Sequence, residues 1–94
     1  MVGMMKRVEC IISGRVQMVM YRDFATRKAR HFAIVGEVAN MGDGTVKVVA
    51  EGEGEQLLAF IEQLKKGSLF AHVARIDVAW REPTGEFNDF SIKY

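Results

Sequence analysis

Residues 8–22 read Val8-Glu9-Cys10-Ile11-Ile12-Ser13-Gly14-Arg15-Val16-Gln17-Met18-Val19-Met20-Tyr21-Arg22 and join an expected strand to an expected helix. Val8, Cys10 and Ile12 alternate with the neighbouring residues, which is the period-two pattern of a strand with one buried face. Apolar residues then recur at helical spacing and predict an amphipathic helix over about residues 22–33. The stretch therefore predicts the opening strand, loop and helix of a β-α-β unit.

The loop between this strand and this helix has the features of an anion site. The first amides of a helix have no partner inside the helix, and the positive end of the helix dipole points the same way. Arg22 adds a planar guanidinium that matches phosphate or carboxylate geometry in a bidentate manner. The alternative interpretation is a surface loop with two solvated arginines, Arg15 and Arg22.

The rest of the chain alternates between strand and helix patterns. The expected elements are strands over about residues 34–41 and 45–51, a second helix from near Glu53 and Glu55 to Gly67, a strand over 74–80 and a short strand over 90–94. Asp43-Gly44 is the kind of turn that pairs hairpin strands, and Pro83-Thr84-Gly85 predicts a second turn.

This order, β-α-β-β-α-β with a terminal strand, predicts an α+β fold of the ferredoxin-like split β-α-β type. We expect an antiparallel sheet with two helices on one face, a short fifth strand and a partly open second face. No linker or low-complexity tract divides the chain, so residues 1–94 are expected to form a single domain.

Composition narrows the classes of function. The 94 residues are 49% hydrophobic and carry a net charge of +1, which gives no general attraction to nucleic acid or to an anionic membrane. Cys10 is the only cysteine and is expected to be a buried free thiol. The first residues show no targeting pattern, and we expect a cytoplasmic protein that acts as a monomer.

The residue pattern gives little support for a metal site, a cofactor site or a catalytic nucleophile. His31 and His72 are far apart, and no group of residues has metal-ligand spacing, so neither a metal nor a cofactor is expected. No serine shows a nucleophile pattern, and Cys10 is in mid-strand rather than at a helix N-terminus. The Asp and Glu residues are expected along solvated strand faces.

Asn40 is unusual because asparagine is depleted in strands. It is either a turn residue leading into residues 41–44 or an amide that donates and accepts hydrogen bonds and can hold a water molecule in one orientation.

These motifs resemble those of the acylphosphatase family. The matching residues are Ser13-Gly14-Arg15-Val16-Gln17, Val19 and Tyr21-Arg22, then Gly36, Val38, Asn40, Asp43-Gly44 and Val46, then Ala50-Glu51-Gly52, Pro83-Thr84-Gly85 and Tyr94. Two motifs at the expected separation, in the expected order of strands and helices, make the resemblance specific.

The resemblance implies metal-independent hydrolysis of small acyl phosphates to a carboxylate and inorganic phosphate. It implies that Arg22 binds the phosphoryl group and that Asn40 orients the attacking water. It also implies that backbone amides of the loop wrap the phosphate, namely those of Arg15, Val16, Gln17, Met18, Val19, Met20 and Tyr21. The expected partner is a small-molecule acyl phosphate, with no cofactor, nucleic acid or membrane.

The chain departs from the family pattern at Met18, where glycine is usual, and at Glu37 and Ala39, where tryptophan and arginine are common. The alternative is therefore a non-catalytic phosphate- or anion-binding module of the same fold, with a loop altered by Met18. An RNA-recognition module shares the order of elements, but it would need aromatic residues on its first and third strands, and residues 8–12 and 45–51 contain none.

Overall fold

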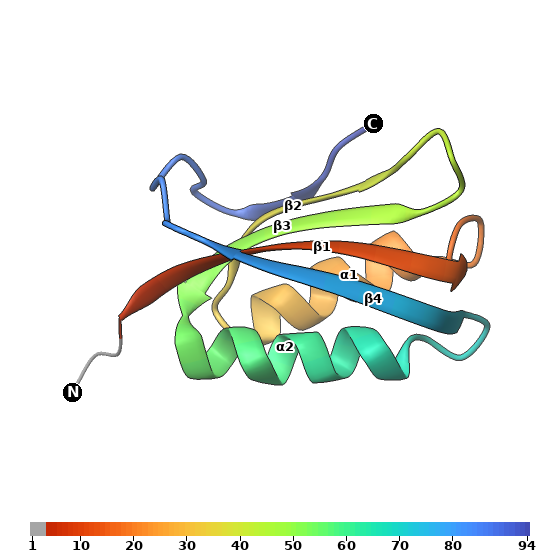
Figure 1. Ribbon diagram of the computed structural model, residues 1–94, viewed down its shortest axis with the longest axis horizontal. Coiled ribbons are helices and arrows are strands. Elements are labelled where there is room, and N and C mark those ends of the chain that lie inside the picture. Colours follow the sequence, from red (N-terminus) through yellow and green to blue (C-terminus); the bar gives the residue numbers. More distant parts are fainter. Residues whose placement is uncertain (1–3) are drawn as a thin grey trace.

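Both helices lie against the same face of one five-stranded sheet (Figure 1). The computed structural model describes residues 4–94. The expectation that the first residues carry no targeting segment therefore lies partly outside the described residues, at residues 1–3. The elements are β1 (Met5–Arg15), α1 (Tyr21–His31), β2 (Val35–Asn40), β3 (Val46–Glu53), α2 (Gly54–Lys66), β4 (His72–Arg81) and β5 (Phe90–Ile92). Their order and type confirm the predicted ferredoxin-like α+β fold.

The strands lie in the order β4-β1-β3-β2-β5. β1 pairs antiparallel with β3 on one side and with β4 on the other, and β2 pairs antiparallel with β3. The short β5 pairs parallel with β2, so the expected antiparallel arrangement holds for the four main strands and the complete sheet is mixed. β1 and β4 are both longer than the alternation of apolar residues predicts. The two strands continue to pair beyond a bulge at Gly14, as far as Arg15 and His72.

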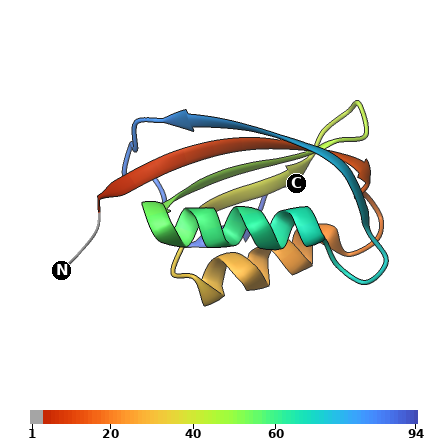
Figure 2. The same ribbon diagram turned by 60° about the horizontal axis from the view of Figure 1, so that its bottom comes forward.

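The core lies between the sheet and the two helices, which Figure 2 shows on one side of the strands. Val8, Cys10 and Ile12 of β1 point into it and are buried, as their alternation predicts. Leu57, Phe60, Ile61 and Leu64 of α2 cover them. Burial raises the pKa of the free Cys10 thiol to about 12, so this thiol stays protonated and unreactive.

Glu51 corrects the expectation that the acidic residues lie on solvated strand faces, because its side chain is only 2% exposed. The segment after β4 crosses the second face of the sheet and brings the backbone amides of Thr84 and Gly85 to the Glu51 carboxylate at 2.9 and 3.0 Å. The Arg7 guanidinium donates to the same carboxylate at 2.7 Å. The sequence pattern missed this because the covering segment is more than 30 residues away.

These contacts determine the ionisation of Glu51. Burial alone would raise the pKa of the carboxyl, but the hydrogen bonds from Thr84, Arg7 and Gly85 outweigh it and lower the pKa to about 2. Since the folded-state pKa lies below the ordinary value of 4.5, ionised Glu51 stabilises the fold above that value. The contribution is lost as the pH falls toward 2.

Within residues 4–94, neither helix has the length and apolar content needed to cross a membrane.

We expect Glu51→Gln to lower the free energy of unfolding at pH 7 by about 1–3 kcal/mol, because Arg7 and the two amides lose their charged acceptor. The wild-type protein should lose more stability than this variant between pH 5 and pH 2.5. Urea unfolding at several pH values measures both quantities. Glu62→Gln, at an exposed position of α2, is the control and should follow the wild type; parallel pH profiles for wild type and Glu51→Gln would contradict the assignment.

Candidate active site

The loop that carries most of the predicted site begins at a bulge in β1. The β1–β4 register shifts between Ser13 and Gly14, and Gly14 has a φ of +127°. A Cβ atom at position 14 would lie 2.1 Å from the backbone oxygen of His72, so only glycine fits there. The chain can therefore leave β1 at this point and turn toward α1.

Two residues of the loop adopt the left-handed conformation. Met18 has a φ of +60° and Met20 a φ of +61°. An L-residue in this region costs roughly 1–2 kcal/mol, so position 18 does have the backbone conformation that glycine adopts more easily. The sequence does not mark Met20 as a left-handed residue, because methionine has no preference for this conformation.

Buried residues hold both ends of this loop. Val16 and Tyr21 are almost fully buried, and the Tyr21 hydroxyl donates to the backbone oxygen of Leu64 at 2.7 Å. Burial is the main reason that the pKa of Tyr21 is raised, so its hydroxyl remains a donor. The strained residues lie between these two fixed points, which keep the loop in one conformation.

The N-terminus of α1 opens toward the loop. Met20 is the N-cap and makes no side-chain hydrogen bond to the first turn, so the amides of Tyr21, Arg22 and Asp23 keep their donor capacity. Arg22 is partly buried and forms no ion pair within residues 4–94. Its guanidinium carbon lies 5.1 Å from the centre of the Tyr94 ring, within range of a cation–π interaction.

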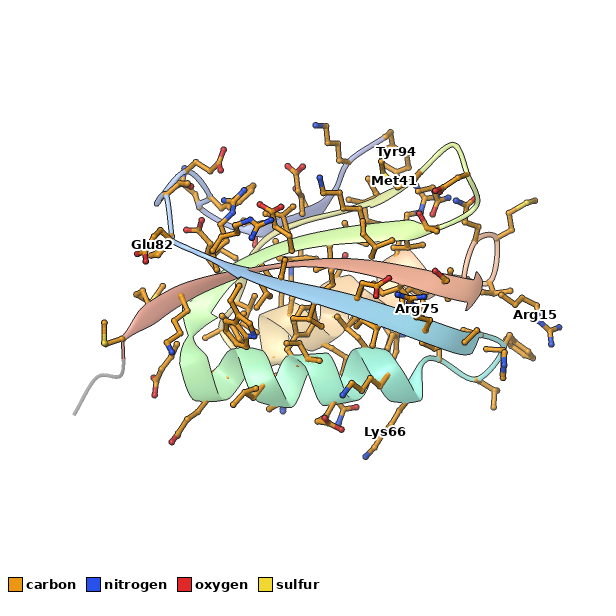
Figure 3. All side chains as sticks on the ribbon, in the orientation of Figure 1. Arg15, Met41, Lys66, Arg75, Glu82 and Tyr94 are labelled. Atoms are coloured by element: carbon orange, nitrogen blue, oxygen red, sulfur yellow. The ribbon has the colours of Figure 1, made fainter. Side chains whose placement is uncertain are left out.

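Arg22 lines a pocket of about 490 Å³ together with loop and C-terminal residues. The other lining residues are Val16, Met18, Met20, Tyr21, Asp23, Ile92 and Tyr94. Arg15 does not line this pocket: it ends β1, pairs with His72 and is exposed at the end of the molecule (Figure 3).

Asn40 ends β2 and lines a second pocket, of about 320 Å³. Its side-chain oxygen Oδ1 is buried and has no hydrogen-bond partner among the residues that the structure describes, so it keeps its full acceptor capacity. Tyr94 borders both this pocket and that of Arg22. The structure thus brings Arg22 and Asn40, 18 residues apart in the sequence, to two pockets that meet at one side chain.

The turn after Asn40 is held by hydrogen bonds. The Met41 amide donates to the Thr45 oxygen at 2.8 Å, and Asp43 Oδ1 accepts from the Thr45 hydroxyl at 2.7 Å and from the Thr45 amide at 3.1 Å. The bond from the Thr45 hydroxyl is the main cause of the lowered pKa of Asp43. The backbone that carries Asn40 is therefore fixed on its C-terminal side.

The side chain of Gln17 joins the two parts of the site, a role that the sequence did not predict. Its Nε2 atom donates to the backbone oxygens of Met41 at 2.9 Å and Thr45 at 2.8 Å. The sequence implied only a backbone amide at this position, and the contact could not be anticipated because it joins segments 24 and 28 residues apart.

The other candidates that the sequence raised lie outside this arrangement. His31 and His72 are both exposed. In the described part of the chain, no three His, Cys, Asp or Glu side chains converge closely enough to hold a metal ion. Glu37 borders the Asn40 pocket, where its carboxylate lies 3.7 Å from the Lys93 ammonium.

The fold and this site define a small α+β protein of the ferredoxin-like class, in which a loop and the uncapped N-terminus of α1 border a pocket that contains an arginine. The family model named acylphosphatase matches residues 8–92. The acylphosphatase of Methylococcus capsulatus is 42% identical over 88 residues, covering 94% of this chain and 96% of the relative. That of Thermus thermophilus is 43% identical over 81 residues, covering 86% and 92%.

A solved structure agrees with these relatives. The crystal structure of acylphosphatase from Bacillus subtilis superposes with a TM-score of 0.92 at 36% identity, covering 97% of this chain and all of that one. The chain therefore belongs to the acylphosphatase family. It is an enzyme of that family, as the resemblance of its motifs predicts.

We expect Gln17→Ala to lower kcat about tenfold or more, because the loop amides and Asn40 lose their fixed relative position. The melting temperature should fall by only a few degrees, since the loss of exposed or partly buried hydrogen bonds costs little. Acyl phosphate turnover and thermal unfolding measure the two effects. The control is Gln56→Ala, an exposed glutamine of α2; an unchanged kcat in folded Gln17→Ala would show that the bridge does not position the site.

Proposed function

We propose that this protein hydrolyses small acyl phosphates to a carboxylate and inorganic phosphate without a metal ion. The observation that carries the proposal is the uncapped first turn of α1 beside Arg22, which lines the loop pocket and forms no ion pair within residues 4–94. Backbone amides and one guanidinium are the groups that stabilise the charge of a transferring phosphoryl group. The membership in the acylphosphatase family supports the same reaction.

In the proposed mechanism, the loop amides from Arg15 to Tyr21 and the guanidinium of Arg22 hold the phosphoryl oxygens. The side-chain amide of Asn40 holds a water molecule in line with the bond between phosphorus and the acyl oxygen. The water oxygen bonds to phosphorus, the old bond breaks, and its electron pair leaves with the carboxylate. One proton of the water passes to a phosphate oxygen, and the other stays on the attacking oxygen.

These roles, binding of the phosphoryl group and orientation of the water, fit the chemistry of the substrate. An acyl phosphate is a mixed anhydride with a good leaving group, so its hydrolysis needs positioning and charge stabilisation more than a strong base. The loop is held for such a role by Val16, Tyr21 and Gln17, which fix it through burial and hydrogen bonds.

The alternative that the sequence raised, a non-catalytic anion-binding module, runs against the membership in an enzyme family. The left-handed conformation of Met18 is the observation in its favour. A strained loop could move an amide away from the phosphate, and the loss of one such donor costs about 10²–10³ in rate. Hydrolysis of acetyl phosphate in the presence of a chelator separates the two candidates. Turnover supports the enzyme, whereas phosphate binding without turnover supports the module.

We further propose that the protein acts as a monomer in the cytoplasm and binds no nucleic acid. The net charge of +1 gives no electrostatic drive toward a polyanion. The outward side chains of β1 and β3 include Glu9, Ile11, Lys47 and Val49 and offer no aromatic ring for a base to stack on.

We expect Arg22→Ala and Arg22→Lys each to lower kcat/KM by about 10²–10³, because lysine keeps the charge but not the planar fork. Both variants should fold, since Arg22 is only partly buried and its described contact is the Tyr94 ring. Steady-state kinetics and circular dichroism provide the measurements. Arg75→Ala, at an exposed arginine of β4, is the control; near-wild-type turnover in Arg22→Ala would overturn the mechanism.

We expect Asn40→Ala to lower kcat by about 10² or more while KM changes little, because a group that orients water acts mainly as the transition state forms. The affinity for inorganic phosphate should stay close to that of the wild type. Asn88→Ala, at an exposed asparagine outside the site, is the matched control. A raised KM with unchanged kcat would mean that Asn40 binds the substrate instead.

A further inference from the structure

Three large apolar side chains project into solvent around the pocket that contains Arg22. Met18 is 98% exposed, Met20 is 73% exposed and Tyr94 is 95% exposed, and all three line that pocket. Single exposed apolar residues are ordinary, but a group of them beside a binding site marks a surface that contacts an apolar ligand. We call Met18, Met20 and Tyr94 the apolar collar.

The backbone holds two members of the collar outward. Met18 and Met20 both occupy the left-handed region, at φ values of +60° and +61°, which costs more for methionine than for glycine or asparagine. Strain of this kind collects at functional sites. Methionine is flexible and polarisable, so a pair of these side chains can fit apolar groups of different shape.

The geometry of the proposed reaction places the acyl group at the collar. The attacking water and the leaving acyl oxygen lie on opposite sides of phosphorus. Asn40 lines one pocket, Met18 and Met20 line the pocket of Arg22, and Tyr94 borders both pockets. A phosphoryl group bound at Arg22 with its water toward Asn40 leaves its acyl group in the pocket that Met18 and Met20 line.

We propose that the apolar collar is the acyl subsite and selects acyl phosphates with an aliphatic or aromatic chain over acetyl phosphate. This inference rests on the proposed function, because it takes the phosphoryl group to be bound at Arg22. A carboxylate-bearing acyl group is the competing ligand. It would need the cations of the other pocket, Lys47 and Lys93, but Lys93 already faces Glu37 at 3.7 Å and that pocket lies on the side of the water.

The test compares hexylphosphonate with methylphosphonate, two inert ligands that share a phosphoryl group, by calorimetry. Each methylene that becomes buried adds about fourfold in affinity, so partial burial of the chain should give hexylphosphonate an advantage of at least about tenfold. In the double variant M18N/M20N the advantage should fall below about threefold. Asparagine is chosen because it tolerates the left-handed conformation, and the ratio cancels changes in phosphate affinity.

Tyr94→Ser is an independent variant that leaves the strained loop untouched and should also reduce the ratio. Leu58→Gln is the matched control, since Leu58 is 56% exposed on α2 and does not line either pocket; its ratio should equal that of the wild type. Equal affinities for the two phosphonates in the wild type, or unchanged ratios in M18N/M20N and Tyr94→Ser, would overturn the proposal. Tighter binding of 3-phosphonopropionate than of hexylphosphonate would overturn it in favour of a carboxylate subsite.

Hydrolysis of acetyl and hexanoyl phosphate is measured in parallel. A preference for hexanoyl phosphate in kcat/KM that falls in the same variants supports the collar. If neither substrate is hydrolysed but hexylphosphonate still binds more tightly than methylphosphonate, the proposed hydrolysis is refuted and the apolar subsite is supported. Failure of the proposed function is thus distinguishable from failure of the subsite.

Discussion

The candidate site depends on one constraint in the path of the chain. β1, an interior strand of the sheet, must reach α1 on one face of the sheet through residues 16–20. β1 pairs with β3 on one side and β4 on the other, so it cannot shift to ease the turn. The bulge at Gly14 and the two left-handed residues of the loop supply the change of direction. The same geometry turns the first amides of α1 toward the loop, so the strand-to-helix connection itself creates the anion site that we propose.

Two left-handed methionines cost roughly 2–4 kcal/mol together, which is a large part of the 5–15 kcal/mol that stabilises a typical domain. The surroundings of the loop offset this cost. Val16 and Tyr21 are buried at its two ends, and Gln17 donates twice to the neighbouring hairpin. The strained residues themselves pack against little, so their side chains are available for contact with a ligand, while the buried ends preserve the backbone.

The predictable part of this protein is local in sequence. The alternation of Val8, Cys10 and Ile12, the helical stripes and the Asp-Gly turn predict each element and its order, because burial of one face imposes the period. The motifs also single out Arg22 and Asn40, and the structure places both on pocket linings, while their catalytic roles stay predictions. The role of Gln17 and the burial of Glu51 could not be predicted, because both depend on contacts between segments 24 to 34 residues apart. Positive φ at position 18 agrees with the glycine usual there, whereas no residue preference marks position 20.

Local charge cancellation supports the proposed binding of a phosphate dianion by a chain of net charge +1. Each of the two pockets has one acidic residue on its lining. Asp23 accepts from Arg27 at 3.1 Å, and Glu37 faces Lys93 at 3.7 Å. Exposed pairs of this kind add little to stability. They matter more for an incoming anion. Asp23 and Glu37 would repel a phosphate that lies within a Debye length, and the paired Arg27 and Lys93 weaken that repulsion. We infer that these pairs leave the guanidinium of Arg22 and the amides of α1 to dominate the local field.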